Sequence, residues 1–259
     1  CNRIRTALSI FKKYKDRFPS FQEQTNIALR YHCSVGNLKW VSLMLWAGAD
    51  PYARGLSSCY EEDDPEAYTT ALELAALHGH HEVFKLKQIR LNPHHQSANG
   101  LMHDVCFSGK TDMLKMLLEQ GFSPNNQQNG GSSHIQYLLT TIHYSFDFND
   151  FWGEREKKMI DNSRSRDKMK MIHLLARHGG KWLPEDVSEI IEARRSLLRM
   201  KPDYTVEFIW IMAGYGSCRR EDIEELIRTP GMQKLTIKQA KQITELIMRL
   251  PSSHYAGAQ

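Results

Sequence analysis

Residues 27–51 form the sequence IALRYHCSVGNLKWVSLMLWAGADP, and two later stretches repeat its pattern. The second stretch is TALELAALHGHHEVFKLK at 70–87, and the third is LMHDVCFSGKTDMLKMLLEQGFSPN at 101–125. In each stretch, small and apolar residues lead to a glycine, a short polar segment follows it, and an apolar run comes next. Self-similarity at this scale predicts a chain built from stacked structural repeats.

Glycine marks the same two places in these stretches. Gly36, Gly79 and Gly109 end the first part of each stretch, and Gly48 and Gly121 end the first and third stretches. Glycine suits a sharp turn between two helices and also a helix C-terminus, because both need a left-handed backbone conformation. The glycines therefore predict that each repeat is a pair of short helices.

Apolar residues recur at helical spacing within the stretches. The residues with this spacing are Leu38, Val41 and Leu45 after the first glycine, and Met113, Met116 and Leu117 after the third. Separations of three and four place such residues on one helix face. A single helix pair cannot bury this face alone, whereas stacked neighbours can, which is why such repeats occur in series.

At these residues the sequence resembles the ankyrin repeat family. The family pattern is roughly T-P-L-H-x-A-A-x-x-G-H, then a second helix, then G-A-D. The matching residues are Thr70-Ala71-Leu72, Ala75-Ala76, Gly79-His80, Gly48-Ala49-Asp50 and Met102-His103. Cys33 and Cys106 take the place of the second alanine, where a small buried side chain fits. The resemblance covers 27–125 and implies an all-α fold, an ankyrin-type α-solenoid of helix-turn-helix repeats with long finger insertions and helical caps.

The rest of the chain extends this organisation. We expect an N-terminal helical cap at 1–24 and repeats at about 25–51, 70–92, 99–125 and 132–182. The fourth repeat combines SSHIQYLLTTI with DKMKMIHLLARHGGKW, separated by an insertion at 143–166, and Gly179 takes the part of Gly48. Residues 183–259 are expected to form divergent helical repeats or a cap.

The resemblance implies protein recognition without catalysis, as an adaptor, a subunit of a larger complex, or an effector that captures a target. In the family, the two variable residues before the Gly-His pair commonly face a concave surface. Here these residues include Leu77, His78, Phe107 and Ser108. Leu77 and Phe107 are apolar, so they are either contacts for a partner or residues covered by a neighbouring insertion.

The first insertion, at 51–68, is acidic and aromatic. Its candidate binding residues are Tyr60, Glu61, Glu62, Asp63, Asp64 and Tyr68. Two interpretations stay open for this segment. It is a solvated acidic loop, or it is a finger that docks on the basic surface of another protein in a heteromeric complex.

The second insertion, at 143–166, carries several large aromatic residues. The candidate binding residues among them are Phe148, Phe151 and Trp152. Such a group either folds back on the repeats or marks a patch that binds a partner.

The charge of the chain is mildly basic, with a formal net charge of +4 and a pI near 8.7. The C-terminal third holds Arg194, Arg195, Lys238 and Lys241, so a nucleic-acid-associated subunit is an alternative function. Aromatic residues do not interleave with these charges as they do in single-strand binding platforms. Nucleic acid is therefore the less favoured partner.

The histidine cluster LHGHHEV at 77–83 is the strongest candidate for chemistry, and the repeat pattern gives it another role. His80 stands at the turn histidine of the pattern, and the spacing H-E-x-x-H of zinc proteases is absent. No C-x-x-C pair or phosphate-binding glycine loop occurs either. We expect no catalytic residue, metal or cofactor, and an enzyme with an unrecognised site is the remaining alternative.

The five cysteines and the lack of a long apolar run bear on location. An odd number of widely spaced cysteines is typical of a reducing compartment. No apolar run approaches the roughly 18–20 residues of a membrane helix. We therefore expect a cytoplasmic protein with no membrane contact.

Overall fold

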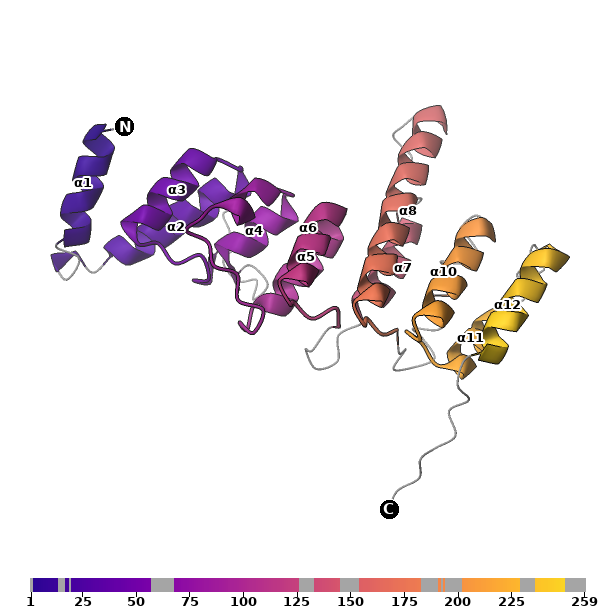
Figure 1. Ribbon diagram of the computed structural model, residues 1–259. Coiled ribbons are helices and arrows are strands. Elements are labelled where there is room, and N and C mark those ends of the chain that lie inside the picture. Colours follow the sequence, from indigo (N-terminus) through magenta and orange to yellow (C-terminus); the bar gives the residue numbers. More distant parts are fainter. Residues whose placement is uncertain are drawn as a thin grey trace, which may run out of the picture. The chain divides into compact units, whose positions relative to one another are not determined.

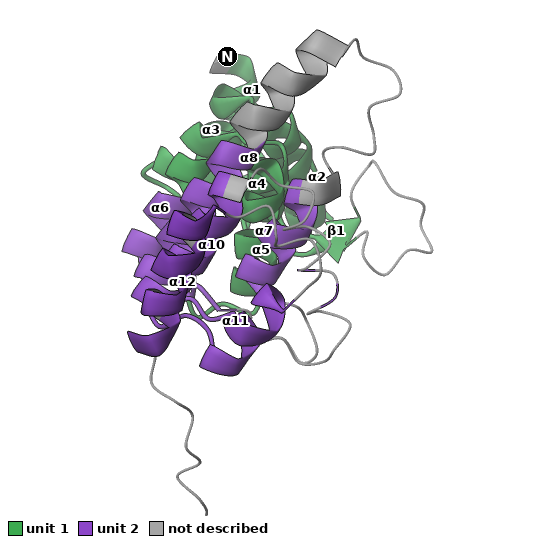
Figure 2. Ribbon diagram, turned by 90° about the vertical axis from the view of Figure 1, so that its right-hand side faces the viewer, with its two compact units in different colours: residues 1–113 green, residues 114–259 purple. Residues whose placement is uncertain are grey.

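The structure of the chain is a computed structural model. It describes residues 2–13, 17–18, 20–56, 68–125, 133–144, 154–182, 191, 193, 202–228 and 236–249. Helices make up most of these residues, which confirms the predicted all-α class (Figure 1). The chain divides into two compact units, 1–113 and 114–259, which are described separately below (Figure 2).

The first compact unit contains five α-helices, one 3-10 helix and a two-stranded sheet among its described residues. They are α1 (Asn2–Lys13), α2 (Phe21–Ser34), α3 (Leu38–Ala47), β1 (Gly55–Leu56), β2 (Tyr68–Thr69), α4 (Ala71–Leu77), η3 (His81–Lys85) and α5 (Ala98–Ser108). Helix α6 (Thr111–Glu119) crosses the boundary. The second unit continues with α7 (His134–Tyr144), α8 (Glu154–Arg177), α10 (Pro202–Gly214), α11 (Arg220–Ile227) and α12 (Ile237–Arg249).

The helices of the first unit lie in two rows. One row contains α2, α4 and α5, where α4 packs against both neighbours. The other row contains α1, α3 and η3, where α3 packs against both neighbours. Helices α2 and α4 also contact the helices that follow them in sequence, as the pairs α2–α3 and α4–η3 show. The order along the chain is therefore a helix of one row followed by a helix of the other.

The glycines that the sequence singles out end helices in a left-handed conformation. The φ angles are 68° at Gly36, 72° at Gly79 and 68° at Gly109. Gly48 and Gly121 end α3 and α6 with φ angles of 105° and 87°. Glycine is favoured at such angles because it has no Cβ to collide with the backbone.

A shared hydrogen-bond pattern closes these helix ends. After Gly36, the Asn37 N–H donates to the His32 carbonyl at 2.9 Å. After Gly79, the His80 N–H donates to the Ala75 carbonyl at 2.8 Å. Such bonds satisfy carbonyls of the last helical turn that have no partner within the helix.

His80 connects two successive helix pairs. Its Nε2 lies 3.0 Å from the Ser34 carbonyl oxygen, at the end of α2. The ring also passes so close to Gly36 that a Cβ added there would lie 2.5 Å from the His80 Nδ1. The expected role of His80 in stabilising a turn agrees with this geometry.

A short antiparallel pair of strands joins the two ends of the first insertion. Gly55 pairs with Thr69, and Leu56 pairs with Tyr68. Thr70 then caps α4 by accepting a hydrogen bond from the Glu73 N–H at 3.1 Å, while the Glu73 carboxylate accepts one from the Thr70 N–H. This reciprocal capping box fixes where the insertion ends and the helix begins.

The core of the second unit forms around Trp182, which is fully buried. Its indole N–H donates to the Gln136 side-chain oxygen of α7 at 2.5 Å, and its ring packs edge-on against Phe208 of α10. The Trp182 backbone N–H donates to the Ser217 carbonyl at 2.6 Å. One residue thus links α7, α10 and the turn after α10.

Two parts of the second unit differ from the sequence-based expectations. Helix α8 begins at Glu154, so residues 154–166 of the expected insertion are helical and continuous with its last part. Helix α10 lies within residues 183–259, which were expected to be helical, but its bounds and the left-handed Gly216 that follows it, with a φ of 58°, were not predicted. The apolar residues of α10 recur at nearly every position instead of at helical intervals, so periodicity does not reveal the helix.

Substitution of Gly36 and Gly109 by alanine tests the His80 contact. Both glycines have a φ of 68°, so Gly109→Ala should lower the free energy of unfolding by about 1–2 kcal/mol through backbone strain alone. Gly36→Ala adds a clash with the His80 ring and should cost about 1–3 kcal/mol more. Urea denaturation measures both, and equal losses would contradict the proposed tight contact.

Substitution of Trp182 by alanine tests the core of the second unit. Removal of this buried ring should lower the free energy of unfolding by about 3–5 kcal/mol. Trp210, which is 54% exposed on α10, provides a control of the same residue type, and Trp210→Ala should change it by less than about 1 kcal/mol. Comparable losses in urea denaturation would show that Trp182 does not organise this unit.

Candidate protein-binding surface

Three large apolar or aromatic side chains are exposed on one side of α2. Ile27, Tyr31 and Val35 are four residues apart and are 44%, 55% and 51% exposed. The opposite side of α2 is buried, with Leu29 and Cys33 in the core. Spacing of four keeps residues on one helix face, so these side chains form a continuous apolar stripe.

Helices α4 and α5 present residues at the matching place, directly before their terminal glycines. His78 is exposed beside the half-buried Leu77 at the end of α4. Phe107 on α5 is 61% exposed, and the neighbouring Ser108 is half-buried with its hydroxyl donating to the Val105 carbonyl. Phe107 is therefore not covered by an insertion among the described residues, whereas Leu77 is partly covered.

Equivalent helix ends bring these residues to one side of the first unit. Val35, His78 and Ser108 each precede a glycine with a φ of 68–72°. The three helices α2, α4 and α5 are neighbours in one row. We call their exposed side the α2–α5 face, which comprises Ile27, Tyr31, Val35, His78, His103 and Phe107.

The Tyr31 side chain packs on other aromatic rings of the first unit. The Tyr31 ring meets the His32 ring edge-on at 5.2 Å, and His32 in turn stacks on Trp40 of α3 with 15° between the planes. Partial burial lowers the pKa of His32 below its ordinary value, so its ring stays neutral at physiological pH. The contacts of His32 with Tyr31 and Trp40 thus hold the exposed Tyr31 ring in place.

The structure describes residues 51–56 and 68 of the first insertion, and residues 143–144 and 154–166 of the second. Tyr68 lies on β2 and is exposed, next to the base of the first insertion. Tyr60, Glu61, Glu62, Asp63 and Asp64 lie outside the described residues. Phe148, Phe151 and Trp152 of the second insertion lie outside them as well. The roles of these insertions stay predictions.

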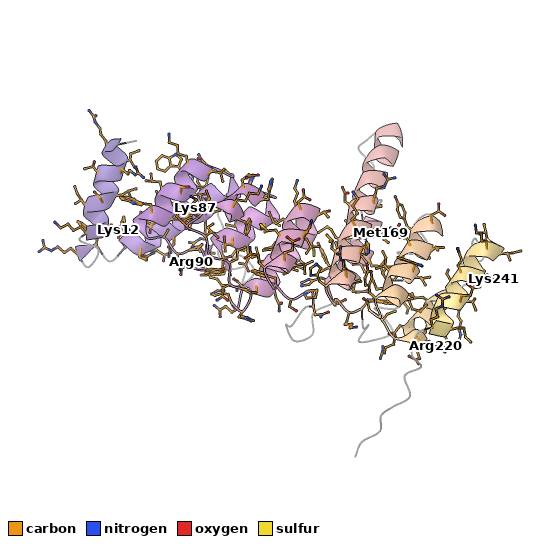
Figure 3. The ribbon with its side chains drawn as sticks, in the orientation of Figure 1. Lys12, Lys87, Arg90, Met169, Arg220 and Lys241 are labelled. Carbon is orange, nitrogen blue, oxygen red and sulfur yellow. The ribbon has the colours of Figure 1, made fainter. Side chains whose placement is uncertain are left out.

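The basic residues of the C-terminal third are partly neutralised. Arg219 makes two hydrogen bonds of 2.8 Å to the Asp222 carboxylate, and Arg220 makes one of 2.8 Å to Glu224. Lys238 and Lys241 are exposed on α12, where Figure 3 shows Lys241 projecting from the helix. Arg194 and Arg195 lie outside the described residues. The alternative of a nucleic-acid partner at Arg194, Arg195, Lys238 and Lys241 stays a prediction.

Among the described residues, the Cys33 and Cys106 thiols are buried and the Cys218 thiol is half-buried, and all three are poorly ionised. Burial raises the pKa of Cys33, Cys106 and Cys218 to about 12. A thiol with such a pKa is almost entirely protonated at neutral pH, whereas the nucleophile in catalysis is the thiolate. Cys33 and Cys106 also sit in the core, as the expected small buried side chains do.

The histidine cluster at 77–83 is divided among separate contacts. His80 lies on the Ser34 carbonyl, while the His81 Nε2 lies 2.6 Å from the Glu82 carboxylate. Within the described ranges, no group of three or more His, Cys, Asp or Glu side chains is arranged to hold a metal ion.

The sequence pattern identifies only part of the α2–α5 face. Ile27 lies two turns, and Tyr31 one turn, before the residues that the pattern places in the groove, so they were not singled out. Their spacing of four from Val35 is visible in the sequence, and it becomes informative only once the opposite side of α2 is known to be buried.

Comparisons with known proteins give no relative for this chain. No family model, no curated protein and no solved structure matches it. Among the helices that the structure describes, none combines the length and apolar character needed to cross a lipid bilayer.

Alkylation by iodoacetamide at pH 8 tests whether a thiol is activated. Cys33, Cys106 and Cys218 should each react at least about 100-fold more slowly in the native protein than in urea, because burial disfavours the thiolate. Peptide mapping by mass spectrometry gives the rate at each residue. Faster reaction of any of them in the native protein would indicate a nucleophilic site.

Proposed function

We propose that this chain is a non-catalytic protein-recognition module of ankyrin type, which binds another protein through the α2–α5 face. The observation that carries the proposal is the set of exposed side chains Ile27, Tyr31 and Val35 on α2 and Phe107 on α5, two helices that flank α4 in one row. Exposed apolar and aromatic residues gathered on one face are typical of protein interfaces.

The repeat pattern supports the ankyrin assignment. Helix pairs separated by left-handed glycines recur, and the turn histidine His80 binds the carbonyl of the preceding pair. In this proposal the repeats α2–α3, α4–η3 and α5–α6 form a solenoid, and α1 serves as its cap. The chain acts as an adaptor, a subunit of a larger complex, or a target-capturing effector.

A preformed surface keeps the cost of binding low. Helices α2, α4 and α5 pack along their length, and Tyr31 rests on His32 and Trp40. A partner would therefore bind without ordering these elements, which preserves more of the interaction free energy for affinity. The exposed His78 and His103 add polar groups at the side of the apolar residues.

The double variant Tyr31→Ala/Phe107→Ala tests the face. Both side chains are mostly exposed, so the melting temperature should change little, while truncation of interface aromatics should weaken partner binding about 10-fold or more. Affinity purification with quantitative mass spectrometry should show specific partners retained by the wild type and depleted with the variant. Purified partner then gives the dissociation constants.

Ile237→Ala/Met248→Ala is the matched control. Both residues are exposed apolar side chains of α12 in the second unit, at 90% and 67%. Partners should remain bound to this control. If the partners are retained by both variants, or lost equally from both, the α2–α5 face is not the binding surface.

A further inference from the structure

The row of α2, α4 and α5 has an open place beside α2. In the first unit, α2 is followed in its row by α4, and α4 by α5. In the other row, α1 precedes α3 as α3 precedes η3. Among the described helices, α3 and η3 each follow a helix of the first row, and α2 has a neighbour in its own row on one side, which is α4.

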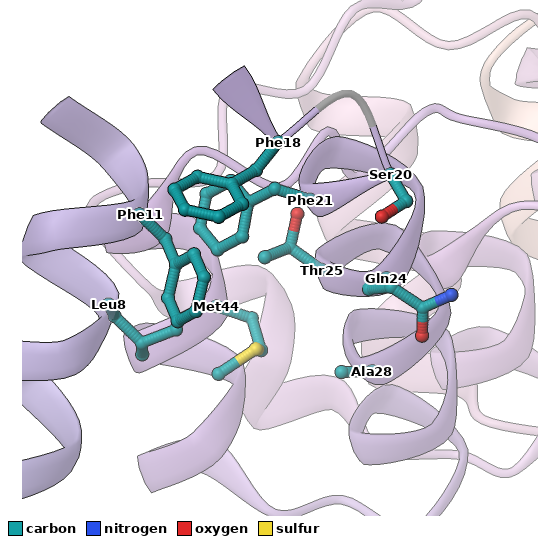
Figure 4. A pocket seen from close by; sticks show the side chains of 9 residues that line it. All are labelled: Leu8, Phe11, Phe18, Ser20, Phe21, Gln24, Thr25, Ala28 and Met44. Atoms are coloured by element: carbon teal, nitrogen blue, oxygen red, sulfur yellow. The ribbon is translucent and has the colours of Figure 1, made fainter. Parts of the chain in front are cut away.

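A hollow of about 360 Å³ lies at this place (Figure 4). Most of its lining is apolar and comes from α1, α2 and α3, with Leu8, Phe11, Phe21, Ala28 and Met44 among the residues. Figure 4 shows the aromatic rings of Phe11, Phe18 and Phe21 gathered on one side of it. This volume lies within the range of pockets that bind ligands.

The surroundings of the hollow are also unusually apolar for a surface. Ile4, Ile10 and Phe11 of α1 are exposed, as is Phe18 in the connection to α2. Phe11 contacts both Phe18 and Phe21, with ring centroids 4.8 and 5.6 Å apart, so the aromatic wall is ordered. An exposed apolar patch that continues into a hollow is typical of a docking site.

The charged residues of α1 indicate which charge a segment bound in the hollow carries. The charged residues of α1 are Arg3, Arg5, Lys12 and Lys13, and the helix has no acidic residue. Arg5 and Lys12 lie over the Trp46 ring of α3, and the Lys12 Nζ also donates to the Trp46 carbonyl at 2.8 Å. These contacts hold α1 against α3 and keep positive charge beside the apolar patch.

We propose that the hollow between α1 and α2 binds an amphipathic α-helix of a partner protein, whose apolar stripe is flanked by acidic residues. The helix takes the next place in the row of α2, α4 and α5 and packs on Phe21 and Ala28 as those helices pack on one another. Its apolar side chains at positions i, i+3 or i+4, and i+7 enter the hollow. Its carboxylates lie near the basic residues of α1. On α2 the hollow adjoins the α2–α5 face, because Ala28 lies next to Ile27 and one turn before Tyr31.

A displayed library of 16-residue peptides, selected against the full chain, tests this proposal. The enriched peptides should carry an apolar stripe at helical spacing with Asp or Glu beside it. Fluorescence anisotropy on a synthetic enriched peptide should then give saturable binding, and replacing its acidic residues by lysine should weaken binding at least tenfold. Enrichment without helical spacing, or insensitivity to the charge change, would overturn the proposal.

Two variants with opposite changes in volume locate the site. Phe11→Ala removes part of the wall, and Ala28→Leu fills the hollow from α2, so both should weaken peptide binding at least tenfold. Because Ala28→Leu adds apolar contacts in open space, its melting temperature should not fall, which separates loss of binding from loss of folding. Unchanged affinity in both variants would overturn the proposal.

Two further measurements separate this site from other possibilities. Phe107→Ala, which changes α5 and not α2, should bind the peptide as the wild type does, so failure of this site and failure of the α2–α5 face give different results. Sedimentation velocity tests for a second copy as the occupant. A wild-type dimer that Ala28→Leu converts to a monomer would overturn the assignment to a partner helix.

Discussion

The left-handed turn that ends the first helix of each pair determines how the first unit is built. At Gly36 and Gly79 the chain reverses at φ angles near 70°, and the next N–H bonds back into the helix just completed. Because the turn is the same each time, successive helices return to the same row. His80 adds a contact between consecutive turns, since its ring reaches the Ser34 carbonyl. Burial of α4 on both sides, and exposure of one face of α2, both follow from this arrangement.

The same geometry explains why binding groups gather on one side. Residues just before each turn lie at equivalent positions, so Val35, His78 and Ser108 come from different helices to one face. Because the repeats carry different side chains at these positions, the polarity and exposure of the surface vary from helix to helix. Phe107, one position earlier, is largely exposed, whereas Leu77 is half-buried at the corresponding place. A repeat thus sets where a contact residue lies, and its own sequence sets what that residue can bind.

The sequence predicts the helix pairs well where glycine and apolar spacing agree. It also anticipates the buried Cys33 and Cys106 and the turn role of His80, since these depend on local pattern. The pattern does not reveal α10, because apolar residues such as Trp210 also stand on its exposed side and hide the helical period. Nor does it reveal the hollow beside α2, since an empty place depends on how α1 packs against α3. Helical residues 154–166 were missed because polar, charged sequence reads equally well as a loop.

The short strands β1 and β2 determine how freely the first insertion can vary in length. Pairing of Gly55 with Thr69 holds the two ends of the first insertion together, and the Thr70–Glu73 capping box restarts the helix directly afterwards. The start of α4 is therefore set by residues outside 57–67. Once the ends of a flexible loop are fixed, doubling its length adds only about 0.6 kcal/mol of closure cost. The insertion can then change rapidly in length and composition during evolution while the helical framework is kept. It can also be replaced by a loop from another protein.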